Sequence, residues 1–402
     1  MKKFIGNIPT ALSVLCDQPA SILLWLSILL LASCKDGAQH EIAPDTYQLE
    51  AQSDLKLKKP DLIVKPGKSI QAAIDKAEAG DLILILPGTY RESFQVNKPH
   101  IKIVGSPFVV IENPGEAEDG IFVGGRSPEP SNADGFELYN VTLRGFEENG
   151  VILIRVNDFV LSHVTTIKCG EYGLFPLFSN GGLIEFCTAS GHTDTGIYVG
   201  QSENIKMRNN KAFANVNGLE IENCSHVVAT NNQCYDNVAG ILVVLLPGLR
   251  VTTSTDIVVE KNRVYKNNHI NFAEPGAGFE SFVPSGSGIL VVGTDGTRVA
   301  QNWVQDNNFL GIAVVSTKLL GGLAGLPDEA FALINPDPDG AQIVRNRLVH
   351  NGMAPPAGIP LPGVDLLWDG TGADNCWRDN AYATSYPAAL PTCAWNAYAQ
   401  GR

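Results

Sequence analysis

The chain has 402 residues and a formal net charge of −13 at pH 7. This acidity argues against a nucleic-acid-binding protein, which needs a basic surface. The sequence also contains no phosphate-binding glycine loop and no Cys-x-x-Cys metal cluster. A chain of this length would ordinarily suggest two or more domains, but a chain of stacked repeats can form a single long one.

Residues 1–33 are typical of an export signal. Lys2 and Lys3 supply positive charge, and residues 22–32 form an apolar run that is short for a permanent membrane span. The run ends in Leu-Ala-Ser-Cys, which resembles the bacterial lipobox. The resemblance implies cleavage before Cys34 and attachment of lipid, such as palmitate, to this residue; an uncleaved signal anchor is the alternative.

The residues after Cys34 bear on where the protein resides. Lys35 stands where an inner-membrane retention signal would have Asp, so the same analogy favours the outer membrane. Residues 34–60 are polar and are expected to form a lipid-anchored linker. The sequence therefore predicts an exported protein that is lipid-anchored in the bacterial cell envelope, at the outer membrane or facing the periplasm.

A short amphipathic helix is expected next, ahead of a strand over residues 82–86. Ile70, Ala73, Ile74 and Ala77 recur at helical spacing, Ser69 can cap the helix, and Gly80 is expected to end it. A helix at this position would cover the open end of a stack of strands. The phrase over residues 65–96 resembles the N-terminal segment of many pectin-lyase-like β-helix proteins.

Two markers then recur in fixed phase along residues 150–380. A phrase of the type Gly-Ile-x-Val begins at Gly150, Gly173, Gly196, Gly218, Gly240, Gly288 and Gly311. Pairs of Asn spaced by five residues occur at Asn210/Asn215, Asn232/Asn237, Asn262/Asn267, Asn302/Asn307, Asn346/Asn351 and Asn375/Asn380. The regular steps of 22 or 23 residues between the glycine phrases are typical of a stacked repeat.

Each repeat contains short alternating apolar and polar segments with Gly or Asn at the corners. Three strands and three corners make one turn, or rung, of a parallel β-helix. The sequence therefore predicts an all-β fold, a right-handed parallel β-helix solenoid over residues 61–380. Like residues should stack from rung to rung, and the Asn side chains should bond to one another along the stack.

The C-terminal residues 381–402 are expected to form a cap. Cys376 and Cys393 are predicted to pair in a disulfide there, since an exported protein meets an oxidising environment. The other cysteines of the repeat region do not fall at matching rung positions, so they are expected to be buried free thiols. These residues are Cys169, Cys187, Cys224 and Cys234.

Interruptions of the repeat indicate where loops leave the coil. The spacing places about 8, 18 and 21 extra residues near positions 246–255, 269–286 and 316–341. All three insertions border the strand that carries the Gly-Ile-x-Val phrase. They are expected to wall a groove over the outward face of that sheet.

Candidate site residues follow from the alternation on this face. Because Leu219 and Ile221 point inward, Glu220 and Glu222 point outward, with Glu220 stacked beside Tyr198. Two carboxylates at this spacing fit an acid–base pair of a glycoside hydrolase, with Asp194 and His192 in the preceding corner as further catalytic candidates. The candidate substrate-binding residues are Tyr198, Gln201, Asn223 and Asn271.

Structural alternatives stand beside each of these roles. The two glutamates fit a solvated pair, and His192 fits a corner residue with a local hydrogen bond. Glu220 and Glu222 could instead bind a hard cation with Asp194. The Asn-Pro-Asp-Pro-Asp-Gly run at residues 335–340 could hold calcium but is a turn signal first. Calcium is thus the one cofactor left open, and no residue is assigned as a metal ligand.

The phrases at residues 191–202, 218–224 and 240–249 and the Asn-Phe-Ala phrase at Asn271 look like those of a family of exported bacterial β-helix lipoproteins. No activity is established for that family, so the resemblance implies a fold and a location. The chain is more distantly similar to β-helix lyases and mannuronan epimerases. It lacks the Asp-Pro-His phrase of the epimerases and offers no obvious cation beside Tyr198, which weakens a direct uronate mechanism.

Three functional hypotheses remain. The leading one is an envelope lipoprotein whose groove binds polysaccharide and, as a glycoside hydrolase or lyase, cleaves or modifies it. The second is a non-catalytic module that binds a glycan or an envelope partner protein, and the third is a metal-delivery accessory. A monomer is expected, without nucleic acid as a partner. The sequence does not choose between catalysis and binding alone.

Overall fold

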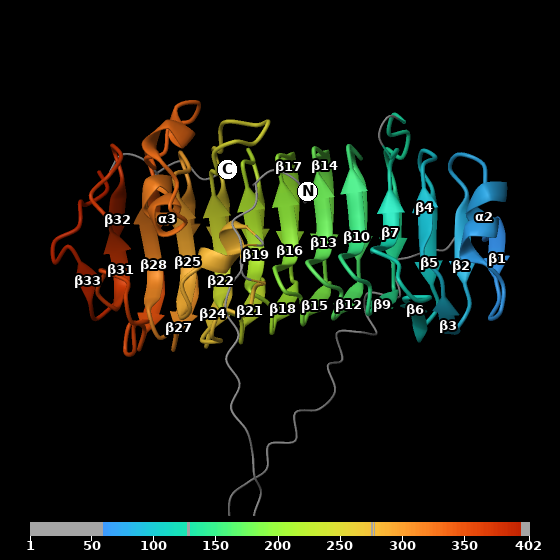
Figure 1. Cartoon of the computed structure of the whole chain (residues 1–402), viewed down its shortest axis with the longest axis horizontal. Coiled ribbons are helices and arrows are strands. Elements are labelled where there is room, and N and C mark those ends of the chain that lie inside the picture. The colour runs from blue at the N-terminus through green and yellow to red at the C-terminus, as the bar shows by residue number, and fades with distance from the viewer. Residues whose placement is uncertain (1–58, 127–128, 275, 277, 395–402) are drawn as a thin grey trace, which may run out of the picture. The chain divides into compact units, whose positions relative to one another are not determined.

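The computed structural model describes residues 59–126, 129–274, 276 and 278–394. Its strands form three sheets in which every neighbouring pair is parallel, and successive strands of the chain pass from one sheet to the next (Figure 1). Each circuit of three strands is one rung. The predicted right-handed parallel β-helix is therefore confirmed.

The strands of each sheet follow one another along the coil. The 12-stranded sheet consists of β1 (Leu62–Val64), β2 (Leu82–Ile85), β5 (Lys102–Gly105), β8 (Glu137–Tyr139), β11 (Phe159–Ser162), β14 (Asn180–Glu185), β17 (Glu203–Arg208), β20 (Val228–Thr230), β23 (Val258–Glu260), β26 (Arg298–Ala300), β29 (Gln342–Val344) and β32 (Cys376–Arg378). The 11-stranded sheet consists of β4 (Phe94–Val96), β7 (Asp119–Val123), β10 (Asn149–Ile154), β13 (Tyr172–Leu177), β16 (Thr195–Gly200), β19 (Asn217–Glu222), β22 (Ala239–Val244), β25 (Ser287–Val292), β28 (Leu310–Val315), β31 (Val364–Trp368) and β33 (Ser385–Tyr386). The 10-stranded sheet consists of β3 (Gly88–Arg91), β6 (Val109–Glu112), β9 (Thr142–Arg144), β12 (Thr165–Ile167), β15 (Thr188–Ser190), β18 (Lys211–Phe213), β21 (Gln233–Tyr235), β24 (Arg263–Tyr265), β27 (Trp303–Gln305) and β30 (Arg347–Val349).

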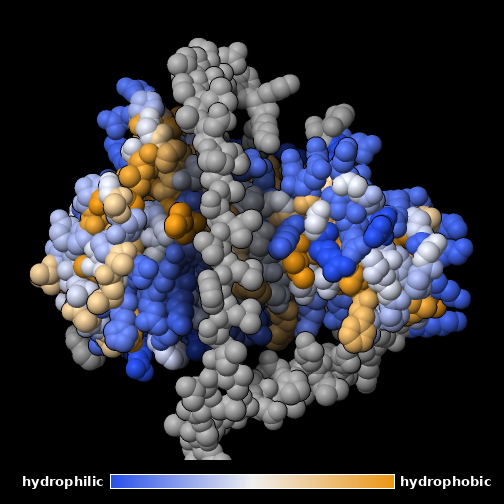
Figure 2. Space-filling view, turned by 60° about the horizontal axis from the view of Figure 1, so that its bottom comes forward, coloured by the Kyte–Doolittle hydropathy of each residue, from blue (hydrophilic) through white to orange (hydrophobic). Residues whose placement is uncertain are grey.

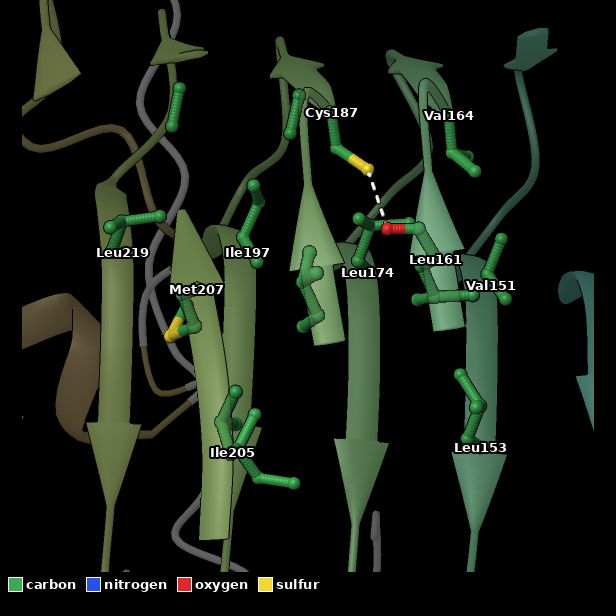
Figure 3. Packing of buried hydrophobic residues seen from close by; sticks show 14 of the residues in the cluster. Val151, Leu153, Leu161, Val164, Leu174, Cys187, Ile197, Ile205, Met207 and Leu219 are labelled. Carbon is green, nitrogen blue, oxygen red and sulfur yellow. Dashed lines mark hydrogen bonds between the residues drawn. The ribbon is translucent and has the colours of Figure 1, made fainter. Parts of the chain in front are cut away.

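The inside of the coil is one continuous apolar core. Inward side chains of successive rungs stack on one another, as Leu174, Ile197 and Leu219 do in the 11-stranded sheet (Figure 3). The cysteines of the repeat region are free and buried, as predicted. Figure 3 shows one of them, Cys187, whose thiol bonds to the Leu161 carbonyl inside the core.

Two ladders of Asn side chains line corners of the coil, which confirms the predicted stacking. In the first ladder, each amide nitrogen donates to the amide oxygen of the next Asn at 3.0 Å, through Asn210, Asn232, Asn262, Asn302, Asn346 and Asn380. The sequence separations are 22, 30, 40, 44 and 34 residues. The ladder geometry is therefore independent of the length of chain between its members.

The last Asn pair does not have the predicted phase. Asn346 bonds to Asn380, so Asn380 and not Asn375 continues the first ladder. In the second ladder, Asn351 donates to the Asp365 carboxylate. A carboxylate oxygen accepts the same bond as an amide oxygen, which is why the spacing of Asn residues alone misassigned this rung.

The predicted capping helix lies at the N-terminal end of the coil as α2 (Ile70–Lys76). Ser69 caps it by accepting a hydrogen bond from the Ala72 amide. The Glu92 carboxylate accepts from the amides of Ile70 and Gln71, which satisfies two further donors of the first turn. The helix ends at Lys76 rather than running to Gly80, because Ala77 already has an extended backbone.

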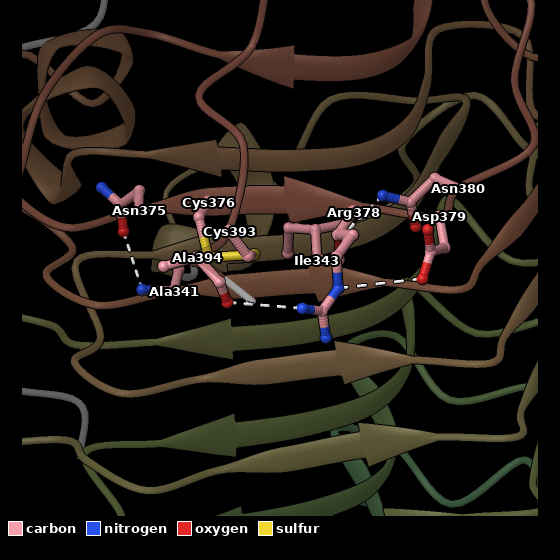
Figure 4. Close-up of a disulfide and its surroundings, with 9 residues drawn as sticks. All are labelled: Ala341, Ile343, Asn375, Cys376, Arg378, Asp379, Asn380, Cys393 and Ala394. Atoms are coloured by element: carbon pink, nitrogen blue, oxygen red, sulfur yellow. Dashed lines mark hydrogen bonds and ion pairs between the residues drawn. A yellow bond between two sulfur atoms is a disulfide. The ribbon is translucent and has the colours of Figure 1, made fainter. Parts of the chain in front are cut away.

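At the C-terminal end, Cys376 in β32 and Cys393 form a disulfide (Figure 4). Near it, the Arg378 side chain bonds to the Ala394 carbonyl and pairs with Asp379. The short strand β33 pairs with β31, so this part of the predicted cap extends the 11-stranded sheet.

The proposed export signal, Cys34 and most of the proposed linker lie outside the described residues. None of the helices in the described part of the chain is long and apolar enough to cross a membrane.

The three predicted insertions leave the coil where the spacing placed them. They follow β22, β24 and β28, and the last two contain η1 (Phe279–Phe282), α3 (Thr317–Leu323) and η2 (Asp328–Phe331). A further insertion between β30 and β31, residues 350–363, was not predicted. The next rung begins with Gly-Val-Asp-Leu at Gly363, which lacks the Gly-Ile-x-Val phrase that marks the other rungs.

Candidate functional site: an acidic patch on the 11-stranded sheet

Adjacent strands of the 11-stranded sheet bring the predicted glutamates beside Tyr198. In the pairing of β16 with β19, Tyr198 is the partner of Glu220 and Gly200 is the partner of Glu222. The Tyr198 hydroxyl donates to Glu222 Oε1 at 2.6 Å. This cross-strand contact is made on the outward face, because Ile197, Val199, Leu219 and Ile221 fill the core.

A single hydroxyl connects two carboxyl groups in this site. Thr195 Oγ1 lies 3.0 Å from Asp194 Oδ1 and in short hydrogen-bond contact with Glu220 Oε2. A hydroxyl carries one proton and can donate only one bond. Both contacts can be hydrogen bonds only when one carboxyl is protonated and donates to Thr195. The geometry therefore favours a proton shared within the Asp194–Thr195–Glu220 chain.

The partners of the carboxyl groups are neutral donors. Asn217 Nδ2 donates to Glu220 Oε2 at 3.2 Å, beside the Thr195 contact. The Tyr172 hydroxyl lowers the pKa of the Asp194 carboxyl group, against the larger raising effect of burial. In the described part of the chain, neither Glu220 nor Asp194 pairs with Lys or Arg. Carboxylates gathered without a cation repel one another and retain protons.

The pKa of each group is shifted in the direction that this argument predicts. Burial, followed by the charge of Glu222, raises the pKa of Glu220 to about 8. Burial, followed by the charge of Asp194, raises the pKa of Glu222 to about 7, against the lowering effect of the Tyr198 hydrogen bond. Burial and then the charges of Glu220 and Glu280 hold the pKa of Asp194 well above its usual range. The patch thus contains protonated carboxyl groups at neutral pH.

Glu280 is the fourth acidic residue and comes from η1, in the insertion between β24 and β25. Its charge contributes to the raised pKa of Asp194, Glu220 and Glu222, and burial raises its own pKa. Glu280 was not predicted as a site residue, because it lies in an insertion without repeat phase. We call Asp194, Glu220, Glu222 and Glu280 the acidic patch.

An aromatic group adjoins the acidic patch on its N-terminal side. The Tyr172 and Phe175 rings stack at 4.4 Å between centroids, and the Phe175 ring meets Tyr198 edge-on at 4.8 Å. Tyr172 and Phe175 were not predicted, because the phrase of their rung, Gly-Leu-Phe-Pro, is an irregular copy. These rings adjoin the patch directly, since Tyr198 contacts both of them and donates to Glu222.

His192 does not lie in the site. Its ring is fully buried inside the coil, where Nε2 contacts Thr166 Oγ1 at 3.1 Å and Nδ1 contacts the Cys169 carbonyl. Burial lowers the pKa of His192 to about 4, so the ring is neutral. Its amide donates to the Asn215 side chain, so His192 occupies the Asn position of the preceding rung. The structure therefore gives it the corner role that was its alternative.

The other predicted binding residues hold the insertions in place. Gln201 Oε1 accepts from the Val251 amide, and Asn223 Nδ2 donates to the Leu246 and Val251 carbonyls. Asn271 Nδ2 donates to the Glu280 and Val283 carbonyls and so shapes the loop that carries η1. These bonds occupy the polar groups that the sequence assigned to a substrate.

Among the described residues, no group of three or more His, Cys, Asp or Glu side chains has the arrangement of a metal site. In the segment proposed for calcium, the side chains serve turns and neighbouring rungs. Asn335 bonds to Asp339, and Asp339 Oδ1 accepts from the Ala373 amide. These carboxylate and amide groups are engaged in holding the loop.

Two arginines lie around the Phe178 ring, beyond the carboxyl ends of β10 and β13 in the same sheet. The guanidinium carbons of Arg155 and Arg250 lie 5.2 and 5.7 Å from the centre of the Phe178 ring. Phe178 directly follows β13, and Arg250 comes from the first insertion. Sequence spacing could not place Arg250 here, because it lies in an insertion without repeat phase.

Beyond β19, the same face of the sheet is apolar and covered. Leu242 and Val244 of β22 are the partners of Glu220 and Glu222, and both are buried. Side chains of the insertions, including Leu246, Val283 and Leu320, pack on the outward residues of β22, β25 and β28. We call this second cluster the apolar layer. Figure 2 shows one group of apolar side chains at the upper left of the view, on the side that holds the C-terminal rungs in Figure 1, and smaller groups on the right.

Comparison with known proteins identifies the architecture. A model described as "Right handed beta helix region" matches residues 119–246. Among curated proteins, none matches this sequence.

The A-module of mannuronan C-5 epimerase AlgE4 from Azotobacter vinelandii is 18% identical with a TM-score of 0.55, and the alignment covers 81% of this chain and 92% of that chain. DFA-IIIase from Arthrobacter chlorophenolicus A6, solved in complex with GF2, is 13% identical with a TM-score of 0.53, covering 80% and 98%. The surface protein and adhesin PfbA of Streptococcus pneumoniae is 12% identical with a TM-score of 0.52, covering 79% and 94%. At these identities the likeness extends to the fold, and the chain is a right-handed parallel β-helix protein.

Proposed function

We propose that the acidic patch and the adjoining aromatic rings bind a polysaccharide and cleave a glycosidic bond by acid–base catalysis. The observation that carries this proposal is the arrangement of Glu220 and Glu222. They stand two residues apart on one strand, beside Tyr198, with raised pKa values and only neutral hydrogen-bond donors. Their Cα atoms are about 6.6 Å apart along a strand, which suits the carboxyl separations of glycosidases.

The environments of the two glutamates suggest different roles. Glu220, with the higher pKa, is the proton donor to the leaving glycosidic oxygen. Glu222, with the lower pKa and the Tyr198 hydrogen bond, carries the negative charge and activates the attacking water. Asp194 then returns a proton to Glu220 through the Thr195 hydroxyl. The proton that Glu222 took from water is released to solvent, and Asp194 takes up a proton from solvent, which restores the starting state. Tyr172, which is partly exposed, offers a ring surface on which a sugar can stack, whereas Tyr198 is buried and orients Glu222.

The solved structures of similar fold are consistent with a carbohydrate ligand. One is a mannuronan epimerase, and another was solved in complex with GF2. At 18% and 13% identity they carry no residue assignments to this chain. The proposal therefore depends on the patch itself.

The deciding experiment is a glycan-panel assay on the purified full chain, reading product formation and binding in the same samples. Glu220→Gln and Glu222→Gln should each lower turnover about 10²-fold or more while binding is retained. Glu203→Gln is the matched control, because Glu203 is exposed at the start of β17 in another sheet. Turnover that persists in Glu220→Gln refutes the assigned proton donor.

A non-catalytic glycan-binding module is the second candidate, favoured by the aromatic stack of Tyr172 and Phe175. Binding without product in the wild-type chain, lost in Tyr172→Ala, would establish it. If the chain binds no glycan, both the catalytic and the glycan-binding proposals are rejected, and a partner protein in the envelope becomes the next candidate ligand.

The pH dependence of turnover tests the proposed pair separately. A protonated Glu220 and an ionised Glu222 coexist best between the pKa values of the coupled pair, about 7 and 8. Activity should therefore fall both below and above this range. A rate that stays constant from pH 5 to 9 would contradict acid–base catalysis by these residues.

We also propose that the protein is exported and lipid-anchored at Cys34. The support is the lipobox-like phrase at residues 31–34, together with a fold found in a surface adhesin. Labelling of cells with a palmitate analogue should mark the wild-type chain and not Cys34→Ser. Equal labelling of both chains would reject the anchor.

A further inference from the structure

A pocket opens within the apolar layer, away from the carboxyl groups that the proposed reaction uses. Its cavity volume is about 250 Å³, and its floor includes Leu242, Leu290 and Ala313 on three successive strands. These residues continue the row of Tyr198 and Glu220 along the face of the sheet. The pocket thus begins one rung from the acidic patch.

The walls of the pocket come from the insertions. Pro284 precedes β25, Leu320 lies in α3, and Ile359 lies in the unpredicted insertion between β30 and β31. Three separate departures from the repeat converge here, although the coil itself does not need them. Such convergence is expected of a pocket that accommodates a ligand.

The lining defines the chemistry of the ligand. Almost all lining side chains are aliphatic, and Phe309 is the one aromatic ring among the described residues of the pocket. Lys318, exposed on α3, is the one lining residue there with a polar side chain. No ion pair of Lys318 occurs in the described part of the chain. A ligand must therefore be aliphatic along its length and polar only where it meets Lys318.

We propose that this pocket binds a long-chain fatty acid, with the alkyl chain on the floor formed by Leu242, Leu290 and Ala313 and the carboxylate at Lys318. Burial of methylene groups supplies the affinity, at a roughly constant free energy for each group. The ammonium group of Lys318 selects a carboxylate over an uncharged end. This site is distinct from the acidic patch and does not depend on the proposed glycan chemistry.

The test is a competition assay on the purified full chain, in which fatty acids displace fluorescent cis-parinaric acid. Palmitate should bind at one site per chain and at least tenfold more tightly than octanoate, because a longer chain buries more methylene groups. Lys318→Met should weaken the binding of palmitate about three- to fivefold, which is the effect expected from the loss of one partly exposed ion pair. The same substitution should leave the affinity for hexadecanol, which has no carboxylate, unchanged. Lys206→Met, an exposed lysine on β17, is the charge control.

A variant that fills the pocket separates binding from adsorption. Gly322 lines the pocket, and a Cβ atom added there meets nothing within 4 Å. Gly322→Phe should therefore fold normally, as judged by its melting temperature, and lose palmitate binding, whereas Gly322→Ala should retain it.

Three outcomes would overturn the proposal. The first is equal palmitate binding by Gly322→Phe and the wild type. The second is an effect of Lys318→Met no larger than that of Lys206→Met, which would indicate an uncharged hydrocarbon ligand. The third is absence of palmitate binding together with a wild-type dimer that Gly322→Phe dissociates, which would assign the pocket to an interface between copies.

Discussion

The acidic patch and the apolar layer occupy the same face of the same sheet, and the pairing of strands is unbroken between them. Tyr198, Glu220 and Leu242 are successive partners, yet the first two belong to a polar network and the third to an aliphatic one. The inward partners of all three strands are apolar and equivalent. The coil therefore imposes the backbone and the core, while the outward residues and insertions determine the chemistry.

The two regions also make opposite contributions to the stability of the folded protein. In the apolar layer, the insertions bury aliphatic side chains, which stabilises the fold. In the acidic patch, four carboxyl groups gather without a cationic partner, which costs stability unless protons are retained. Unfavourable electrostatics of this kind are typical of functional sites.

Placing a carboxylate in the apolar layer should have the largest effect. Leu242→Glu would put an unpaired acid among Leu290, Leu246 and the neighbouring Glu220. We expect a loss of unfolding free energy on the order of 3–5 kcal/mol at pH 8, measured by guanidinium denaturation. Leu333→Glu is the control, since Leu333 is 80% exposed and should tolerate the change. A loss below about 1 kcal/mol would mean that the layer admits water.

The reverse exchange should stabilise the protein while abolishing turnover. Glu220→Leu combined with Glu222→Val copies the residues of β22 into β19. The folded-state pKa of Glu220 is about 8 against an ordinary 4.5, so the folded wild type binds protons more tightly than the unfolded chain. Wild-type stability should consequently fall as pH rises from about 4.5 to 8.

The double variant lacks this pH dependence and should exceed the wild type by on the order of 2–4 kcal/mol at pH 8, with little difference at pH 4. Denaturation curves at the two pH values provide the measurement. Glu203→Leu is the control and should show the same dependence of unfolding free energy on pH as the wild type. A steeper loss of stability in the double variant would contradict the raised pKa values.

Truncation of one side chain of α3, the helix that covers the apolar layer, should lower the stability by an intermediate amount and leave the acidic patch unchanged. Leu320→Ala removes a buried side chain of α3 and should cost about 2 kcal/mol, at the lower end for such truncations because the site lies near the surface. The pKa values of Glu220 and Glu222, followed by NMR of the carboxyl carbons, should not change. A shift in either value would show that the two regions are coupled.

The smallest expected effect concerns the hydroxyl that links two acids. Thr195→Val should alter stability by about 1 kcal/mol and separate the titrations of Asp194 and Glu220, because their shared hydrogen-bond partner is gone. Thr195→Ser keeps the hydroxyl and should restore the wild-type titration. Identical titration curves for the valine variant and the wild type would remove Thr195 from the proton chain.

Most of the fold could be predicted from the sequence because the same spacing of marker residues recurs in many rungs. The Asn pairs and the Gly-Ile-x-Val phrases fixed the rungs and placed three insertions. Prediction failed where a chemical equivalent replaced the marker, as Asp365 replaces Asn in the second ladder. The insertion over residues 350–363 was overlooked for the related reason that the following rung has an irregular phrase.

The candidate site was predicted in part, as far as alternation could reach. Alternation placed Glu220, Glu222 and Tyr198 on one face, but Glu280 comes from an insertion whose path has no period. His192 was misplaced although a signal existed. It lies 23 residues before Asn215, one repeat away, which assigns it to the ladder position inside the coil. Hydrogen-bond partners such as Thr195 depend on side-chain geometry and have no sequence signature.

The first Asn ladder has a consequence for how such a chain can change. Its bonds keep a length of 3.0 Å whether 22 or 44 residues separate the two members. The stacking of the rungs therefore does not depend on the length or sequence of a corner loop. One loop can be replaced by another without a change in the positions of the stacked strands. A lineage built on this coil could acquire a new ligand or reaction by replacing one insertion at a time, while the spine that supports it remains the same.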